Sequence, residues 1–252
     1  MKTTFKYIFP TFFFLIGILS LSSCHKDNPP TPAPAMGLVY FHLHTNIDTT
    51  EADSGVVCHD ATGRHFQLNI AQLYLSNIVL HKPDNTTYTV TGAYVLKIIA
   101  NEEYLVGQAP AGNYTSVSFN VGIDAATNAM NPSMMTGCLA PQTPSMWFGS
   151  IAQGYMFANV QGVADTTAAQ AGPVNCAFSY QLGTSAMLET VNLPSQPFTV
   201  VSGQTALVHI ICDYGRMLQG IDFKTQSMAT PFSNAGVAAQ IAANVPFMFH
   251  YE

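Results

Sequence analysis

Charged residues are scarce in this chain, amounting to 9% of its 252 residues. Lysine and arginine together number 8 against 14 acidic residues, which gives a formal net charge of −6 at pH 7. A chain with so few cations contains no basic run that could neutralise a phosphate backbone. The composition therefore excludes nucleic acid as a partner.

Signatures of common catalytic sites are also missing. The sequence has no H-E-x-x-H, no G-x-S-x-G, no P-loop and no G-x-G-x-x-G. The segment Gly183-Thr184-Ser185-Ala186-Met187 begins like a nucleophile elbow but lacks the final glycine, and no alternating strand–helix pattern surrounds it. We therefore predict that the protein is not an enzyme.

Long helical periodicity is absent, and a period of two takes its place. Thr115, Val117, Phe119 and Val121 alternate with polar residues and glycine, which is typical of a half-buried strand. Similar apolar segments, separated by turn signals about every ten residues, lie at 39–43, 66–70, 73–80, 88–90, 94–99, 155–160, 177–182, 198–201, 206–213 and 247–251. The pattern predicts an all-β fold, a two-sheet β-sandwich, with one short helix near the C-terminus that Ser233 caps.

The N-terminal segment predicts export. Lys2 and Lys6 flank an apolar run that ends in Leu21-Ser22-Ser23-Cys24, a lipobox-like order of charge, apolar residues, small residues and cysteine. We predict a lipoprotein signal peptide at 1–23, acylation of Cys24, a proline-rich tether at 24–36 and a single domain at 37–252. The protein would then be an outer-membrane lipoprotein that faces the periplasm or the cell surface; an ordinary secreted protein is the alternative.

Four cysteines remain once Cys24 is assigned to the lipid anchor: Cys58, Cys138, Cys176 and Cys212. An even number in an exported chain predicts two disulfides, for which the sequence allows three connectivities. Copper thiolates are the alternative use of these residues.

Two histidines share one strand face near the start of the domain. His42 and His44 alternate with Phe41 and Leu43, so both imidazoles point to the same side and are candidate ligands for one copper or zinc ion. Two solvated histidines on an outer face are the alternative. His209 shares its strand face with Leu207 and Ile211, which predicts a packed core histidine instead.

A methionine-rich loop leads to the single tryptophan, Trp147. It contains Met130, Met134, Met135 and Met146, and thioethers are soft ligands that favour Cu(I). Methionine also fills irregular gaps around aromatic rings, which is the alternative interpretation.

From Phe66 onward the chain resembles the MbnP-like copper-binding family. The resemblance lies in Tyr74-Leu75-Ser76-Asn77-Ile78, Tyr94-Val95-Leu96, Pro110-Ala111-Gly112-Asn113-Tyr114, Ser118-Phe119-Asn120-Val121-Gly122-Ile123-Asp124, the Trp147 neighbourhood with Gly154-Tyr155, and Ile241-Ala242-Ala243-Asn244. It implies a β-sandwich, a copper site that uses histidines and an oxidised tryptophan, and a di-haem oxidase partner that modifies the tryptophan. Many relatives have a histidine where this chain has Gln181.

Two functional classes follow from these observations. The first is a lipid-anchored cell-envelope protein that captures or transfers copper, with His42, His44, Met146 and Trp147 as the candidate metal site. The second is a β-sandwich binding or adhesion module that has no metal. Metal content distinguishes the two.

Overall fold

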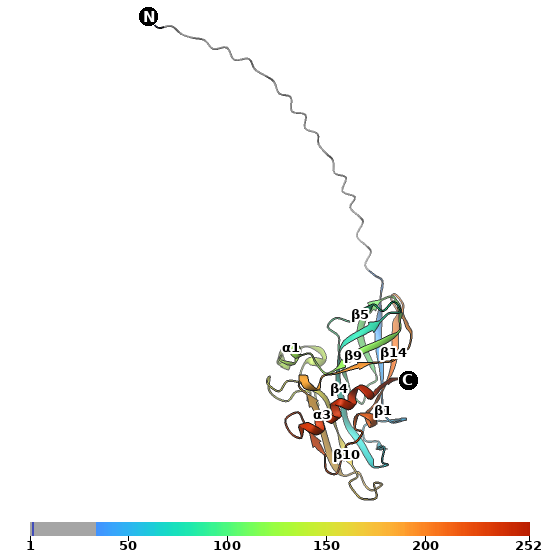
Figure 1. Cartoon of the computed structure of the whole chain (residues 1–252), viewed down its shortest axis with the longest axis vertical. Coiled ribbons are helices and arrows are strands. Elements are labelled where there is room, and N and C mark those ends of the chain that lie inside the picture. The colour runs from blue at the N-terminus through green and yellow to red at the C-terminus, as the bar shows by residue number, and fades with distance from the viewer. Residues whose placement is uncertain (1, 3–33) are drawn as a thin grey trace. The chain divides into compact units, whose positions relative to one another are not determined.

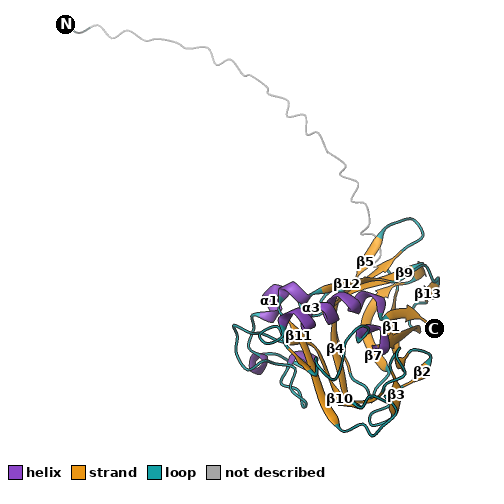
Figure 2. Ribbon diagram, turned by 60° about the horizontal axis from the view of Figure 1, so that its bottom comes forward, coloured by secondary structure: helices purple, strands orange, loops and turns teal. Residues whose placement is uncertain are grey.

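The computed structural model describes residue 2 and residues 34–252, and the latter form one compact unit, 34–252 (Figure 1). Apart from Lys2, the predicted signal peptide lies outside the described residues, as do Cys24 and the predicted tether up to residue 33. Strands are the main regular secondary structure of the described domain (Figure 2), which confirms the all-β prediction.

Two main sheets build the domain. The five-stranded sheet has the order β16-β14-β1-β2, with β7 also paired to β1. Its strands are β1 (Met36–Ile47), β2 (Thr50–Glu51), β7 (Glu103–Pro110), β14 (Thr205–Asp213) and β16 (Phe249–Tyr251). The pairing of β1 with β14 is parallel and joins segments from the two ends of the domain.

The nine-stranded sheet is organised around the long strand β4 (His65–His81), which pairs with five other strands. The other members are β3 (Val57–His59), β5 (Thr87–Thr89), β6 (Tyr94–Lys97), β9 (Ser116–Val121), β10 (Met156–Ala164), β11 (Cys176–Gly183), β12 (Glu189–Asn192) and β15 (Met228–Ala229). A separate small pair joins β8 (Gly112–Tyr114) to β13 (Phe198–Val200).

Helices are short and peripheral to the sheets. The α-helices are α1 (Ala125–Asn128), α2 (Tyr214–Met217) and α3 (Ala235–Asn244), and 3-10 turns cover Pro132–Met134, Gly137–Leu139, Ser185–Met187 and Val245–Phe247. Helix α3 is the predicted helix near the C-terminus. Its N-cap is Asn234, in a left-handed conformation with no side-chain cap bond, so the prediction that Ser233 caps it is wrong.

The main core lies between the two sheets. Every second residue of β1 is buried, so Val39, Phe41 and Leu43 point inward. The Phe41 ring lies 6.1 Å from the ring of Phe119 on β9, which connects the five-stranded sheet to the nine-stranded one. Complete burial of such a side chain contributes about 1.5–3 kcal/mol to stability. This alternation leaves His42 and His44 on the outer face, as the sequence predicts.

One buried cation lies beneath the five-stranded sheet. Lys97 is fully buried, and its Nζ donates to Thr45 Oγ1 at 2.6 Å and to the carbonyl oxygens of Ile98 and Asn101 at 2.9 and 3.2 Å. Burial lowers the pKa of Lys97, and the nearby Cys212 and Glu102 oppose that change. These three hydrogen bonds satisfy the ammonium group that burial removes from water.

The prediction of two disulfides is wrong for this structure, because Cys58, Cys138, Cys176 and Cys212 are all free thiols. Cys58 lies opposite Phe66 on β4, Phe66 lies opposite Ala164 on β10, and Ala164 lies opposite Cys176 on β11. Adjacent strands are about 4.8 Å apart, so three spacings place these two cysteines about 14 Å apart. A disulfide requires Cα atoms closer than about 7 Å.

The other two cysteines lie in separate environments. Cys138 lies beside Tyr94, with its Sγ 3.4 Å from the carbonyl oxygen. Cys212 is fully buried on β14, where burial raises the pKa of its thiol to about 12 although Lys97 has the opposite effect. An even count of cysteines therefore carried no information about pairing.

Candidate metal site

A row of imidazoles and carboxylates crosses the outer face of the five-stranded sheet. In the parallel β1–β14 register His42 lies opposite His209, and in the antiparallel β1–β7 register His42 lies opposite Glu103. On β16 Tyr251 lies opposite Ile210, so the next residue, Glu252, is brought alongside His209. Strand register alone thus assembles residues from both ends of the domain.

Three histidine rings on this face, those of His42, His44 and His209, lie close together. The ring centroids of His42 and His44 lie 4.3 Å apart, and those of His42 and His209 lie 4.9 Å apart and are nearly parallel, at 17°. One ring nitrogen from each of His42, His44 and His209 lies within 4.8 Å of those of the other two. We call these three residues the histidine cluster.

Two glutamates bridge the histidine cluster. Glu102 lies 3.1 Å from His42 Nε2 and 3.3 Å from His44 Nδ1. Glu252 lies 3.5 Å from His44 Nε2 and 3.0 Å from His209 Nδ1. Each carboxylate therefore contacts two rings, and together the two carboxylates contact all three.

Two imidazole nitrogens in the cluster are buried without a hydrogen bond, His42 Nδ1 and His209 Nδ1. His209 Nδ1 is close to Glu252, but the contact lacks hydrogen-bond geometry, and His42 Nδ1 has only a 3.9 Å approach to Glu103. An unpaired buried nitrogen costs free energy unless a ligand uses its lone pair. Because Glu102 accepts from His42 Nε2, His42 Nδ1 is left with a lone pair that no group in the described domain uses.

The donor set fits a transition-metal ion. Imidazole nitrogens bind zinc at about 2.0–2.1 Å, so nitrogens on one ion lie up to about 4 Å apart. In the histidine cluster the nitrogens lie within 4.8 Å of one another, so the rings would move only slightly closer together to bind one ion. His44 belongs to a second group of possible ligands with Glu51 and Glu102, which extends the donor set with oxygen atoms.

The prediction for His209 is wrong. The buried residues of β14 are Ala206, Val208, Ile210, Cys212 and the final residue, Asp213, so Leu207, His209 and Ile211 face outward. Residues 206–212 are apolar except for His209, and such a run does not show which alternate set is inside. Only the pairing of β14 with β1 shows that His209 lies beside His42, and the sequence does not reveal that pairing.

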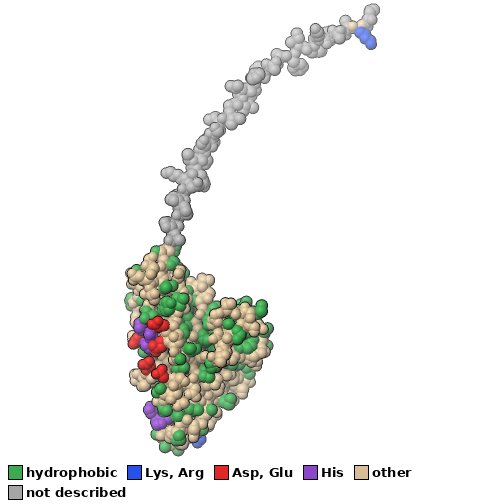
Figure 3. Space-filling view, turned by 180° about the vertical axis from the view of Figure 1, so that it is seen from behind, with side chains coloured by type: hydrophobic (Ala, Val, Ile, Leu, Met, Phe, Trp, Pro, Cys, Tyr) green, Lys and Arg blue, Asp and Glu red, His purple; other side chains and the backbone are tan. Residues whose placement is uncertain are grey.

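Figure 3 shows histidine and acidic side chains together on one face of the domain, with no lysine or arginine among them in the part of that face described. The histidine–glutamate contacts account for five of the six ion pairs found among the described residues, and the sixth joins Arg216 to Asp213. The carboxylates of this face therefore have no surface cation as a partner.

Met146 and Trp147 lie elsewhere in the domain. They belong to a second apolar cluster with Tyr74, Tyr155 and Phe157, and the Trp147 ring contacts Tyr155 edge to face at 5.1 Å. Tyr74 alternates along β4 with residues of the main core, so this cluster covers the outer face of the nine-stranded sheet. The structure does not bring Met146 and Trp147 together with His42 and His44.

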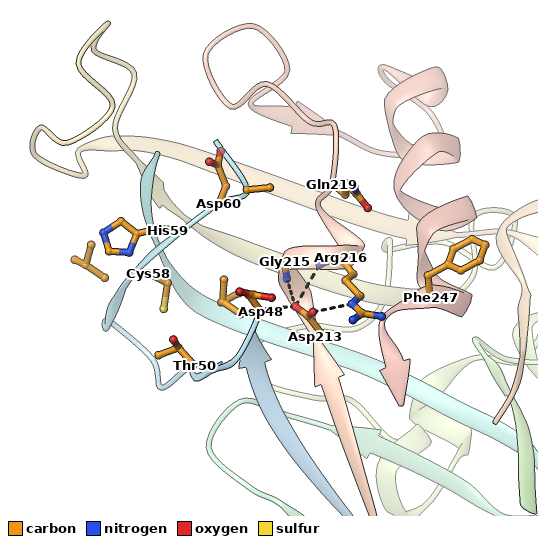
Figure 4. A pocket seen from close by; sticks show the side chains of 13 residues that line it. Asp48, Thr50, Cys58, His59, Asp60, Asp213, Gly215, Arg216, Gln219 and Phe247 are labelled. Atoms are coloured by element: carbon orange, nitrogen blue, oxygen red, sulfur yellow. Dashed lines mark hydrogen bonds and ion pairs between the residues drawn. The ribbon is translucent and has the colours of Figure 1, made fainter. Parts of the chain in front are cut away.

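A cavity of about 780 Å³ lies beside the end of β14, also away from the histidine cluster (Figure 4). Cys58, His59, Asp213, Arg216 and Phe247 are among its lining residues. Asp213 accepts hydrogen bonds from the backbone of Gly215 and forms an ion pair with Arg216 Nε at 3.1 Å. The volume is typical of a site for a small organic ligand.

Fold and site together define a class of protein: a β-sandwich with a surface cluster of histidines that carboxylates contact. The comparisons with known proteins identify the family. The MbnP family model matches residues 37–235, and this chain belongs to that family. The solved structure of MbnP from Methylosinus trichosporium is similar, with a TM-score of 0.57 and 13% sequence identity, and the match covers 75% of this chain and 80% of that one.

At that identity the likeness establishes the fold and no more. No curated protein matches the chain. Within the residues that the structure describes, none of the helices has the length and apolar character needed to cross a membrane.

Proposed function

We propose that this protein binds copper at the histidine cluster and captures or transfers it at the cell envelope, without being an enzyme. The observation that supports this proposal is the approach of one nitrogen from each of three histidines to within 4.8 Å of the others. Family membership supports a metal-related role, and imidazole is a good ligand for copper. The cluster replaces the ligand set of His42, His44, Met146 and Trp147 suggested by the sequence.

The protein's own residues would hold the ion in two ways. His42, His44 and His209 supply neutral imidazole nitrogens, while Glu102 and Glu252 orient the rings. A carboxylate that contacts one ring nitrogen fixes the tautomer and strengthens the other nitrogen as a donor. A bound copper ion would take the lone pairs of the imidazole nitrogens, and any histidine that is protonated would release its proton as the ion binds.

Copper titration of the domain tests the proposal. The triple variant His42→Gln/His44→Gln/His209→Gln should bind copper at least tenfold more weakly than the wild type, because glutamine replaces each imidazole. Competition against a chromophoric chelator measures the affinity. A melting curve without metal shows whether the variant is folded.

His59 and His65 provide a matched control. They lie directly opposite each other on β3 and β4, with ring centroids 4.6 Å apart, but they belong to no group of three possible ligands among the described residues. The variant His59→Gln/His65→Gln should retain wild-type copper affinity. Full copper binding by the triple variant would place the site elsewhere.

We also propose that this protein is an outer-membrane lipoprotein that is acylated at Cys24 and faces the periplasm or the cell surface. We further propose that its partner is a di-haem oxidase that acts on Trp147. The lipobox-like sequence supports the anchor, and family membership supports the partner. Intact-mass analysis of protein purified from native membranes should show a lipid adduct, absent in Cys24→Ser, and oxygen added at Trp147. An unmodified mass would contradict both.

A metal-free binding module is the second candidate, and the cavity beside Asp213 and Arg216 favours it. Its lining combines the Asp213–Arg216 ion pair with the exposed ring of Phe247, which suits a small ligand with both polar and apolar parts. Absence of metal binding by the wild-type domain would favour this candidate.

A further inference from the structure

We propose that the histidine cluster selects a divalent ion, Cu(II) or Zn(II), over Cu(I), and that Glu102 and Glu252 are the residues that set this selectivity. The inference rests on the proposed function, because it takes the histidine cluster as the metal site. It adds the charge state of the ion and names two residues that determine it.

The first argument is the excess of negative charge around the histidine cluster. Glu51, Glu102, Glu103 and Glu252 approach the three histidines, and none of these glutamates forms an ion pair with lysine or arginine in the described domain. Lys97 is the nearby cation: its ammonium group is buried beneath the sheet on Thr45 and attracts Glu102, so one cation stands against four carboxylates. Several carboxylates remain for an ion to neutralise, and by Coulomb's law each attracts a dication twice as strongly as a monocation.

The second argument is the absence of soft donors from the cluster. Thioethers and thiolates favour Cu(I), whereas imidazole and carboxylate suit divalent ions. Met146 belongs to the apolar cluster on the outer face of the other sheet. Cys212 lies on β14 but is buried in the main core, on the opposite side of the strand from His209.

The third argument is how the two carboxylates are placed. Glu102 contacts His42 and His44, and Glu252 contacts His44 and His209, at distances from 3.0 to 3.5 Å. Both carboxylates therefore lie next to the atoms that would bind the ion, either as further oxygen ligands or through the rings. Glu103 makes one longer contact, 3.9 Å from His42 Nδ1, so its charge acts on the cluster from a greater distance.

The test compares two oxidation states of one metal. Cu(II) affinity is measured in air and Cu(I) affinity anaerobically with a reductant, each against a chelator specific for that state, with Zn(II) as a redox-inert dication. For Glu102→Gln/Glu252→Gln we expect Cu(II) and Zn(II) affinity to fall at least tenfold and Cu(I) affinity to fall less than threefold. Glu103→Gln should cause a smaller loss, and Glu189→Gln, on β12 of the other sheet, should cause none.

The outcomes separate this inference from the proposed function. Equal losses of Cu(I) and divalent affinity in the double variant would overturn the inference while leaving the histidine cluster as the metal site. Unchanged affinity for all three ions would also overturn it. A wild-type domain that binds no metal, or a triple histidine variant that binds normally, would overturn the proposed function and the inference together. Melting without metal confirms that each variant is folded.

Discussion

Replacement of Gly122 by alanine is expected to destabilise the domain by about 3–5 kcal/mol, as overpacking adds to backbone strain. Gly122 follows β9 and has a φ of 120°, a conformation that residues with a side chain rarely adopt. A Cβ atom there would lie 2.4 Å from Cδ2 of Phe157 and 2.8 Å from Leu188. Both atoms belong to residues of the apolar cluster around Trp147.

The backbone at Gly122 has little freedom to move away from this overlap. Its N–H donates to the carbonyl oxygen of Tyr74 at 2.8 Å, and its own carbonyl oxygen accepts from Ser76 Oγ at 2.7 Å. Any shift that relieves the overlap therefore weakens the junction of β9 with β4. Urea-induced unfolding measures the loss in the free energy of unfolding.

Gly203→Ala is the matched control for Gly122→Ala. Gly203 also has a positive φ, of 70°, but a Cβ atom there would meet nothing within 4 Å. We expect a loss of about 1 kcal/mol, the cost of the backbone conformation alone. If the two substitutions destabilise the protein equally, steric overlap at Gly122 is not the cause.

Asp213→Ala is expected to cost about 2–4 kcal/mol, because it removes a helix cap and the acceptor of three backbone N–H groups, while its ion-pair partner Arg216 is 54% exposed and adds little. The side chain is 3% exposed, and its Oδ1 accepts from the backbone of Asp48, Gly215 and Arg216 at 2.9, 2.9 and 3.3 Å. Its Oδ2 lies 3.1 Å from Arg216 Nε. Alanine leaves these donors without an acceptor at the wall of the cavity.

Asp213→Asn separates the two contributions. An amide oxygen can still accept from the backbone N–H groups, but the charge that pairs with Arg216 is lost. We expect thermal unfolding to place this variant between the wild type and alanine. An alanine variant as stable as the wild type would show that water replaces the carboxylate at little cost.

The alternation of apolar and polar residues correctly predicted features that lie within a single strand. The apolar residues of 39–43 indicated a strand with Val39, Phe41 and Leu43 inward, and the structure confirms the outward face that carries His42 and His44. Family motifs and turn spacing predicted the sandwich correctly. The alternation within the strand depends only on neighbours within a few residues, which is why it can be recognised in the sequence.

Features that depend on pairing between distant strands were not predictable. His209 lies in an apolar run without visible parity, and Glu252 reaches it only through the register of β16 on β14. The loop before Trp147 is rich in soft donors, but nothing in its sequence shows that it packs on the nine-stranded sheet. The cysteine count likewise could not show that Cys58 and Cys176 end up three strands apart.

The parallel pairing of β1 with β14 has a consequence for the order of events during folding. His42 comes from the first strand of the domain, His209 from β14 and Glu252 from the residue after β16, so these residues meet only through pairing of segments far apart in the chain. Contacts between such distant segments are slow to form, because a long chain must first be ordered. A chain whose synthesis has not yet reached β14 would present only His42 and His44, so the complete histidine cluster would form only after synthesis of the domain is complete.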